Sequence, residues 1–140
     1  MIRLVIPGKP LGKQRPRVLK NGITYTPKET VNYETLIKEI YATEYRLQRP
    51  KEGPLELKIR AYFPIPKSVS KTKATSMERG HIRPTKKPDV DNIIKIVADA
   101  LNGIAYRDDS QIVSCSLEKW YSNIPRVEIE IQEVCENDRC

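Results

Sequence analysis

The stretch Pro88-Asp89-Val90-Asp91-Asn92-Ile93-Ile94-Lys95 crowds carboxylates into a basic chain, directly before a helical pattern. Residues two apart in an extended segment point the same way, so Asp89 and Asp91 are predicted to face one site. If Asp91 caps the helix, Lys95 follows one turn later on the same face. A tight turn would return Asp109 to that place. Three converging carboxylates suit a hard divalent cation such as Mg²⁺.

Each of these aspartates also has a purely structural interpretation. An aspartate before a helix is commonly a cap, and Asp108-Asp109-Ser110 before a strand is commonly a turn. For any one residue the two interpretations stay open. Together, with a lysine at the matching helical offset in a basic chain, the three carboxylates favour a metal site.

The size of the chain predicts one domain, residues 1–140, which is long enough to bury a core. Three cysteines, without C-x-x-C spacing, predict neither a disulfide framework nor a thiolate zinc site, so a reducing cytoplasm is expected. No apolar run approaches the roughly 20 residues of a membrane span. Residues 1–6 are also too short for a signal peptide. A soluble protein with no membrane partner is expected.

The formal net charge of +7 is concentrated in two segments. Residues 1–20 carry six Lys or Arg and no acid, and residues 67–87 carry seven against Glu78 alone. Such segregation predicts an electropositive surface for a polyanion, with nucleic acid as the leading candidate. The alternative is a pair of solvated loops that favour solubility. The residues expected to contact nucleic acid are Lys9, Lys13, Arg15, Arg17, Lys71, Lys73, Arg83, Lys86 and Lys87.

Periodicity predicts an α+β domain in which a small mixed sheet packs with two helices. The helices are expected from a Thr26 cap, with Pro27 first, to about Gln48, and from Asn92 to Asn102. The strands and other segments expected are a strand at Ile2–Ile6, a hairpin at Val18–Tyr25 with a type I′ turn at Asn21-Gly22, a strand at Leu55–Phe63, a mobile basic loop over about 64–88, a hairpin of Ile112–Trp120 and Val127–Ile131 joined through 122–125, and a frayed tail over about 135–140.

His81 is the only histidine and falls in the basic loop. With no second histidine or nearby cysteine, it is interpreted as an exposed loop residue. Histidine-based metal binding and serine or cysteine triads are therefore disfavoured.

The pattern Asp89-x-Asp91-Asn92-x-x-Lys95-x-x-x-Asp99-x-Leu101-Asn102, followed by Asp108-Asp109-x-Gln111, resembles the RusA family of Holliday junction resolvases, common in phages and prophages. Gly8-Lys9-Pro10 and Arg15-Pro16-Arg17 also resemble its phage-type members. The resemblance implies a Mg²⁺-dependent endonuclease of DNA recombination and repair, for which Mn²⁺ can substitute. It implies a homodimer that nicks two strands of a four-way DNA junction symmetrically.

By position, Asp89, Asp91 and Asp109 match the family's catalytic, metal-binding aspartates, and Lys95 matches its active-site lysine. Asp108 matches a neighbouring, less critical acid. The basic loop here exceeds the short link of the cellular members, so the resemblance does not define its contacts with DNA.

Two other functions remain alternatives. In a non-catalytic basic DNA-binding domain, the aspartates would be caps and turns. A Mg²⁺ phosphohydrolase on small phosphates would use the acids but leave both basic segments without a purpose. Metal-dependent nicking of a synthetic junction separates the first alternative from a resolvase.

Overall fold

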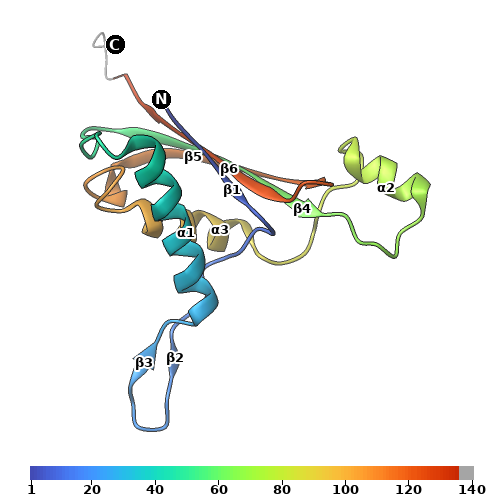
Figure 1. Ribbon diagram of the computed structural model, residues 1–140, viewed down its shortest axis with the longest axis horizontal. Helices are drawn as coiled ribbons and strands as arrows, with labels where there is room; N and C mark the ends of the chain where they lie inside the picture. The colour runs from blue at the N-terminus through green and yellow to red at the C-terminus, as the bar shows by residue number, and fades with distance from the viewer. Residues whose placement is uncertain (136–140) are drawn as a thin grey trace. The chain divides into compact units, whose positions relative to one another are not determined.

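The computed structural model describes residues 1–135 (Figure 1), so the tail predicted to fray lies, from residue 136, outside the described residues. Contacts divide the chain into two compact units. The first unit comprises residues 1–10, 53–87 and those from 110 on, and the second comprises residues 11–52 and 88–109. Three helices and a mixed four-stranded sheet confirm the predicted α+β class.

The first unit contains the mixed sheet, whose strand order is β1-β6-β4-β5. Its strands are β1 (Ile2–Pro7), β4 (Leu55–Pro64), β5 (Ile112–Ser122) and β6 (Arg126–Glu133). β6 is antiparallel to both β1 and β4, whereas β4 is parallel to β5. Leu4, Ile129 and Ile59 lie side by side in register and are at most 2% exposed. The period of two therefore buries one face of β1, β6 and β4, whereas the edge strand β5 has no buried residue.

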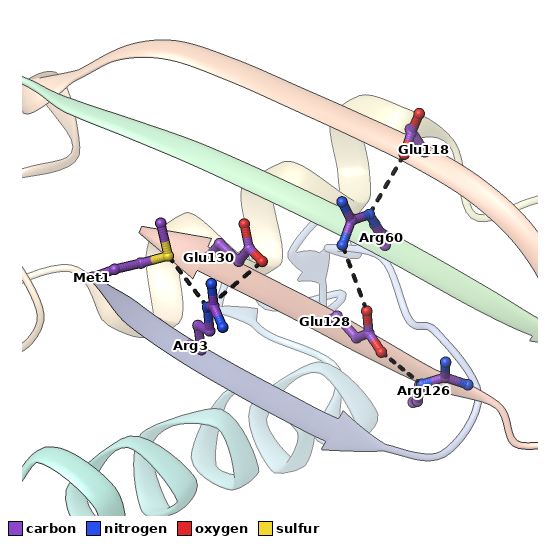
Figure 2. Close-up of polar contacts among 7 residues, drawn as sticks. All are labelled: Met1, Arg3, Arg60, Glu118, Arg126, Glu128 and Glu130. Carbon is purple, nitrogen blue, oxygen red and sulfur yellow. Dashed lines mark hydrogen bonds and ion pairs between the residues drawn. The ribbon is translucent and has the colours of Figure 1, made fainter. Parts of the chain in front are cut away.

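The opposite face of the sheet carries charged side chains in cross-strand pairs (Figure 2). Arg3 on β1 approaches Glu130 on β6 at 3.9 Å. Arg60 on β4 lies between Glu118 on β5, at 3.6 Å, and Glu128 on β6, at 3.9 Å. Opposite charges across neighbouring strands favour this register, although each exposed pair contributes only about 0–1 kcal/mol.

The hairpin predicted through residues 122–125 is wrong, because β4 lies between β5 and β6. Residues 123–125 instead cross the end of β4. Two strand spacings amount to about 9.6 Å, which three linking residues at roughly 3.3 Å each can span. A turn signal shows that the chain reverses, but it does not say which strand lies next to which.

The loop predicted over about 64–88 contains a helix, α2 (Lys71–Glu78). The hydroxyl of Ser70 accepts a hydrogen bond from the N–H of Lys73 at 3.2 Å and caps the first turn. Gly80, with φ +83°, ends the helix and donates its N–H to the carbonyl of Met77 at 3.1 Å. Met77 is the only buried residue of α2, so no apolar stripe marks the helix in the sequence.

The second unit contains α1 (Lys28–Tyr45), α3 (Val90–Leu101) and a hairpin of β2 (Arg17–Val18) and β3 (Thr24–Tyr25). Figure 1 shows the hairpin extending from the first turn of α1. The helix predicted from Asn92 to Asn102 is confirmed as α3, and six of its residues are buried. On α1 the buried residues include Tyr33, Ile37 and Tyr41, whereas Val31 is 46% exposed.

The β2–β3 hairpin is confirmed, but its turn is placed differently from the prediction. The N–H of Gly22 donates to the carbonyl of Leu19 at 2.9 Å, so the central residues are Lys20 and Asn21. Gly22 follows them with φ +83°. An Asn-Gly pair suits both a turn centred on Asn21-Gly22 and a turn centred on Lys20-Asn21 that is followed by the glycine. The register of the two strands determines which turn forms.

The structure bears on the predicted absence of a membrane span and on the cysteines. No described helix combines the length and the apolarity that a membrane span requires. No disulfide framework was predicted; of the described cysteines, Cys115 on β5 is a free thiol and Cys135 is disulfide-bonded.

Ile129→Ala should lower the free energy of unfolding by about 2–5 kcal/mol, because it leaves a cavity at the centre of the sheet's buried face. Val5→Ala is the matched control, since Val5 lies on the same sheet and is 52% exposed. It should change stability by less than about 0.5 kcal/mol. Urea denaturation measures both values, and equal losses would contradict this account of the core.

Candidate active site

The first turn of α3 carries two of the predicted ligands. Asp89 is the N-cap residue, with φ −73° and ψ 160°, and its side chain makes no capping hydrogen bond. The helix begins at Val90 rather than at Asn92, so Asp91 lies inside the first turn and is not the predicted cap. The pair is therefore not set by alternation in an extended segment. Both carboxylates belong to the end of α3 where the helix dipole is positive.

Asp89, Asp91 and Asp109 are all exposed, and none forms a hydrogen bond or ion pair through its side chain with another described residue. Asp109 begins a 3₁₀ helix, η1 (Asp109–Gln111). Within residues 1–135, no three acidic, histidine or cysteine side chains form a group that could hold a metal. Convergence of the three aspartates is therefore not seen, and their roles as ligands stay predictions.

These donors nevertheless fit Mg²⁺ in kind. Asp89 and Asp91 offer only carboxylate oxygens, unengaged by any cation of the described chain. Mg²⁺ is commonly held by one or two protein carboxylates, with water and substrate phosphates as its other ligands. A site completed by substrate does not require three converging protein side chains.

Lys95 lies on an exposed part of α3. Its side chain is 62% exposed, and its Nζ is 3.9 Å from Oδ2 of Asp99, one turn later. An exposed pair at this separation contributes at most a few tenths of a kcal/mol. The ammonium group is therefore weakly held.

Lys13 makes much closer contacts than Lys95. Its Nζ lies 2.8 Å from Oε1 of Glu34 on α1 and 3.3 Å from Oδ2 of Asp99 on α3, and its side chain is only 18% exposed. Burial by itself lowers the pKa of Lys13, but hydrogen bonds and charge from Glu34 and Asp99 outweigh burial and raise it above 10.5. Lys13, predicted to contact nucleic acid, thus cross-links the two helices.

Gly12 brings the same segment against residues 88–92 at the start of α3, called the acidic turn below because they include Asp89 and Asp91. The sequence did not single out this glycine. The N–H of Lys13 donates to the carbonyl of Asn92 at 2.8 Å. A Cβ on Gly12 would lie 2.8 Å from Cβ of Pro88 and 3.0 Å from Cβ of Asn92. Only glycine permits this approach. The only sign of this contact in the sequence was a glycine next to Lys13. The sequence could not show which residues it contacts, because Pro88 and Asn92 are far along the chain.

Tyr106 anchors the segment that leads from α3 to Asp109, and it too was missed. It is 1% exposed, and its hydroxyl donates to the carbonyl of Ala98 at 2.6 Å. From Ala98 back to Asp91 the helix rises about 10 Å at roughly 1.5 Å per residue. Three residues from Tyr106 to Asp109 span at most about 10 Å. The return segment therefore has the length to bring Asp109 toward the first turn.

Apart from Lys13, the predicted nucleic-acid contacts are exposed. Arg15 and Arg17 follow within five residues of Gly12, which packs on the acidic turn. His81 is exposed, as predicted. The remaining exposed cations are Lys9, Lys71, Lys73, Arg83, Lys86 and Lys87. Exposure makes phosphate contacts available to them, and their DNA-binding roles stay predictions.

Comparison with known proteins identifies the family to which this arrangement belongs. Residues 7–132 match the family described as Endodeoxyribonuclease RusA. The chain belongs to the RusA endodeoxyribonuclease family. The RusA match includes residues of both units and every candidate acid and lysine of the site. It confirms the resemblance found in the sequence and supports an endodeoxyribonuclease role, in a family of generally divalent-metal-dependent nucleases.

A relative in Bacillus subtilis (strain 168), described as uncharacterized protein YqaN, is similar to this chain over nearly its whole length. The two are 40% identical over 138 residues, which cover 95% of this chain and 96% of the relative. The similarity therefore extends over nearly the full length of both chains and is not limited to isolated motifs.

Lys13→Ala should destabilise the protein by about 1–3 kcal/mol, because Glu34 and Asp99 lose their shared cation. Since the folded-state pKa of Lys13 is raised, its contribution is full below pH 10.5 and is lost as the pH rises through the folded value. Denaturation of both proteins at neutral and strongly alkaline pH measures this difference. The exposed Lys9→Ala is the control, and equal stability of the two variants at neutral pH would contradict the cross-linking role.

Proposed function

We propose that this protein is a divalent-metal-dependent endonuclease that resolves four-way DNA junctions in recombination and repair. The supporting observation is the exposed first turn of α3, where Asp89 and Asp91 present unpaired carboxylates in a chain of the RusA family. The proposed reaction is hydrolysis of one phosphodiester bond in each of two symmetrically placed strands.

The proposed metal ligands are Asp89, Asp91 and Asp109, with Mg²⁺ as the cofactor and Mn²⁺ able to substitute. When bound, the cation supplies Lewis acidity that activates water and neutralises charge on the phosphate. Carboxylates left without a metal repel a phosphate group. The three aspartates would therefore disfavour binding of a substrate phosphate without the metal and favour it when the cation is bound.

Lys95 has a role that fits its weak contact with Asp99. A phosphodiester gains negative charge on its oxygens as water attacks. An ammonium group that no carboxylate holds closely can move to the phosphate and offset this charge. Asp99, 3.3 Å from Nζ of the partly buried Lys13, keeps a cation partner if Lys95 moves away. In this proposal Lys13 has the structural role and Lys95 has the chemical role.

The exposed cations supply attraction for DNA as a polyanion. Arg15 and Arg17 come directly after the segment packed on the acidic turn, while Lys71, Lys73, Lys86 and Lys87 belong to the α2 region. Phosphate contacts of this kind release counterions and give sequence-independent affinity. A homodimer with two such sites suits a junction whose opposing strands are related by approximate two-fold symmetry.

One observation favours a second candidate, a non-catalytic DNA-binding domain. Among residues 1–135 no group of three potential ligands could by itself hold a metal. Incubating the protein with a synthetic four-way junction, with and without Mg²⁺, separates the two functions. Paired nicks that need the metal support a resolvase, whereas binding without nicking under either condition supports the second candidate.

Asp89→Asn, Asp91→Asn and Asp109→Asn should each abolish junction cleavage and leave binding intact or tighter, because each removes a charge that holds the metal and repels phosphate. Asp108→Asn should lose less activity. Glu29→Gln is the matched control, since Glu29 is the acidic residue in the first turn of another helix, α1. Cleavage and gel-shift assays measure both properties, and near-normal nicking by any one asparagine variant removes that residue from the site.

Lys95→Ala should slow single-turnover cleavage by about 100-fold to 1000-fold. Because Lys95 is 62% exposed, the free energy of unfolding should change by less than about 0.5 kcal/mol. Lys38→Ala, at another exposed helical lysine, should change neither property. A variant of Lys95 that cuts at the unsubstituted rate would show that this ammonium is not catalytic.

A further inference from the structure

Trp120 is the only tryptophan of the protein, and it lies on β5 beneath the segment that follows α2. Gly80, with φ +83°, is directly against its ring. A Cβ on Gly80 would lie 2.7 Å from Cζ3 and 3.2 Å from Cε3 of the indole, so no larger residue fits without movement. The turn that ends α2 is therefore seated on the tryptophan.

Arg83 makes the second contact with Trp120. Its guanidinium carbon is 3.5 Å from the centre of the indole ring, and its Nε donates to the carbonyl of Lys119 at 2.6 Å. Arginine favours such stacking because its charge is planar and weakly hydrated. This guanidinium therefore holds the segment to β5 and has less freedom to contact phosphate than its exposure suggests.

Further contacts continue along the same two segments. Nζ of Lys119 donates to the carbonyl of Lys86 at 2.6 Å, and Nζ of Lys86 is 5.6 Å from the ring centre of Tyr121. At the other end, Asn123 donates a hydrogen bond to Glu78, the last residue of α2, at 3.1 Å. The segment from residue 78 to residue 86 is thus fixed to β5 and the turn after it.

The cations that were predicted to contact nucleic acid in α2 and residues 79–87 fall into two groups. Arg83 and Lys86 contact β5, as described above. Lys71, Lys73 and Lys87 are exposed and make no side-chain ion pair with any described residue. Their charges are carried on a backbone that is itself held by Trp120, Lys119 and Asn123.

We infer that α2 and residues 79–87 form a preformed DNA-contacting arm, with Trp120 as the positioning residue that holds it. The inference rests on the proposed function for the identity of its partner, a DNA backbone. A mobile loop would have to be ordered on binding, at a cost for each immobilised side chain. Docking on Trp120 removes part of that cost before DNA arrives.

The fluorescence of the single tryptophan reports docking of the arm directly. Gly80→Ala should displace the turn from the indole, shift the emission maximum to longer wavelength and increase quenching by acrylamide. Hydrogen exchange in peptides covering residues 71–87 should also become faster. These measurements use the whole protein without DNA, so they do not depend on its activity.

Gly103→Ala is the matched control, because Gly103 follows α3 as Gly80 follows α2. Its φ is +82°, nearly that of Gly80, but a Cβ there would meet no atom within 4 Å. Both variants strain the backbone, and only Gly80→Ala clashes with the indole. Similar fluorescence and exchange in the two variants would overturn the docking role of Trp120.

Arg83→Ala tests the same contact without steric conflict, should Gly80→Ala fail to fold. It should also increase acrylamide quenching, and an unchanged value would count against the inference. Gly80→Ala should then bind a four-way junction roughly tenfold more weakly than Gly103→Ala, since several side chains must be ordered on binding. Equal affinities overturn the inference alone, whereas failure of the unsubstituted protein to bind DNA overturns the proposed function itself.

Discussion

The close contact between Gly12 and the first turn of α3 is the constraint on which the candidate active site depends. The backbone at Gly12 approaches Pro88 and Asn92 so closely that a Cβ would stand 2.8 Å from proline, and the next residue, Lys13, hydrogen-bonds to Asn92. The side chain of Lys13 then joins Glu34 on α1 to Asp99 on α3. One short segment thus fixes both ends of a helix whose first turn carries the proposed ligands.

Cationic side chains occupy two distinct environments in this protein. Lys13 and Arg83 make internal contacts, the first with two carboxylates and the second with an indole ring and a backbone carbonyl. Exposed cations such as Lys71 and Lys73 make no such contacts within the described chain. The net positive charge indicates that the partner is a polyanion. It overstates how many cations can contact that partner, because a cation that is close to a carboxylate or an aromatic ring is held there.

Each compact unit contributes a different part of the proposed function. The second unit contains the proposed ligands Asp89, Asp91 and Asp109 together with Lys95, and the first contains α2 with its exposed lysines. The RusA match over residues 7–132 includes both units. The proposed cleavage residues therefore belong to the second unit, and many of the cations proposed to bind DNA belong to the first. Because the segments of the two units alternate along the chain, neither proposed function corresponds to one continuous stretch of sequence.

The sequence by itself determined the α+β class, the strands β1 and β4, the apolar helix α3, and the acidic and lysine residues of the RusA pattern, because these depend on local periodicity and spacing. It could not determine that β4 separates β5 from β6, since strand neighbours are chosen by burial and register across the whole sheet. It missed α2, whose single buried residue leaves no stripe. The roles of Gly12, Lys13, Gly80 and Trp120 were decided only by tertiary structure, because each depends on an atom brought close by residues far away in the chain.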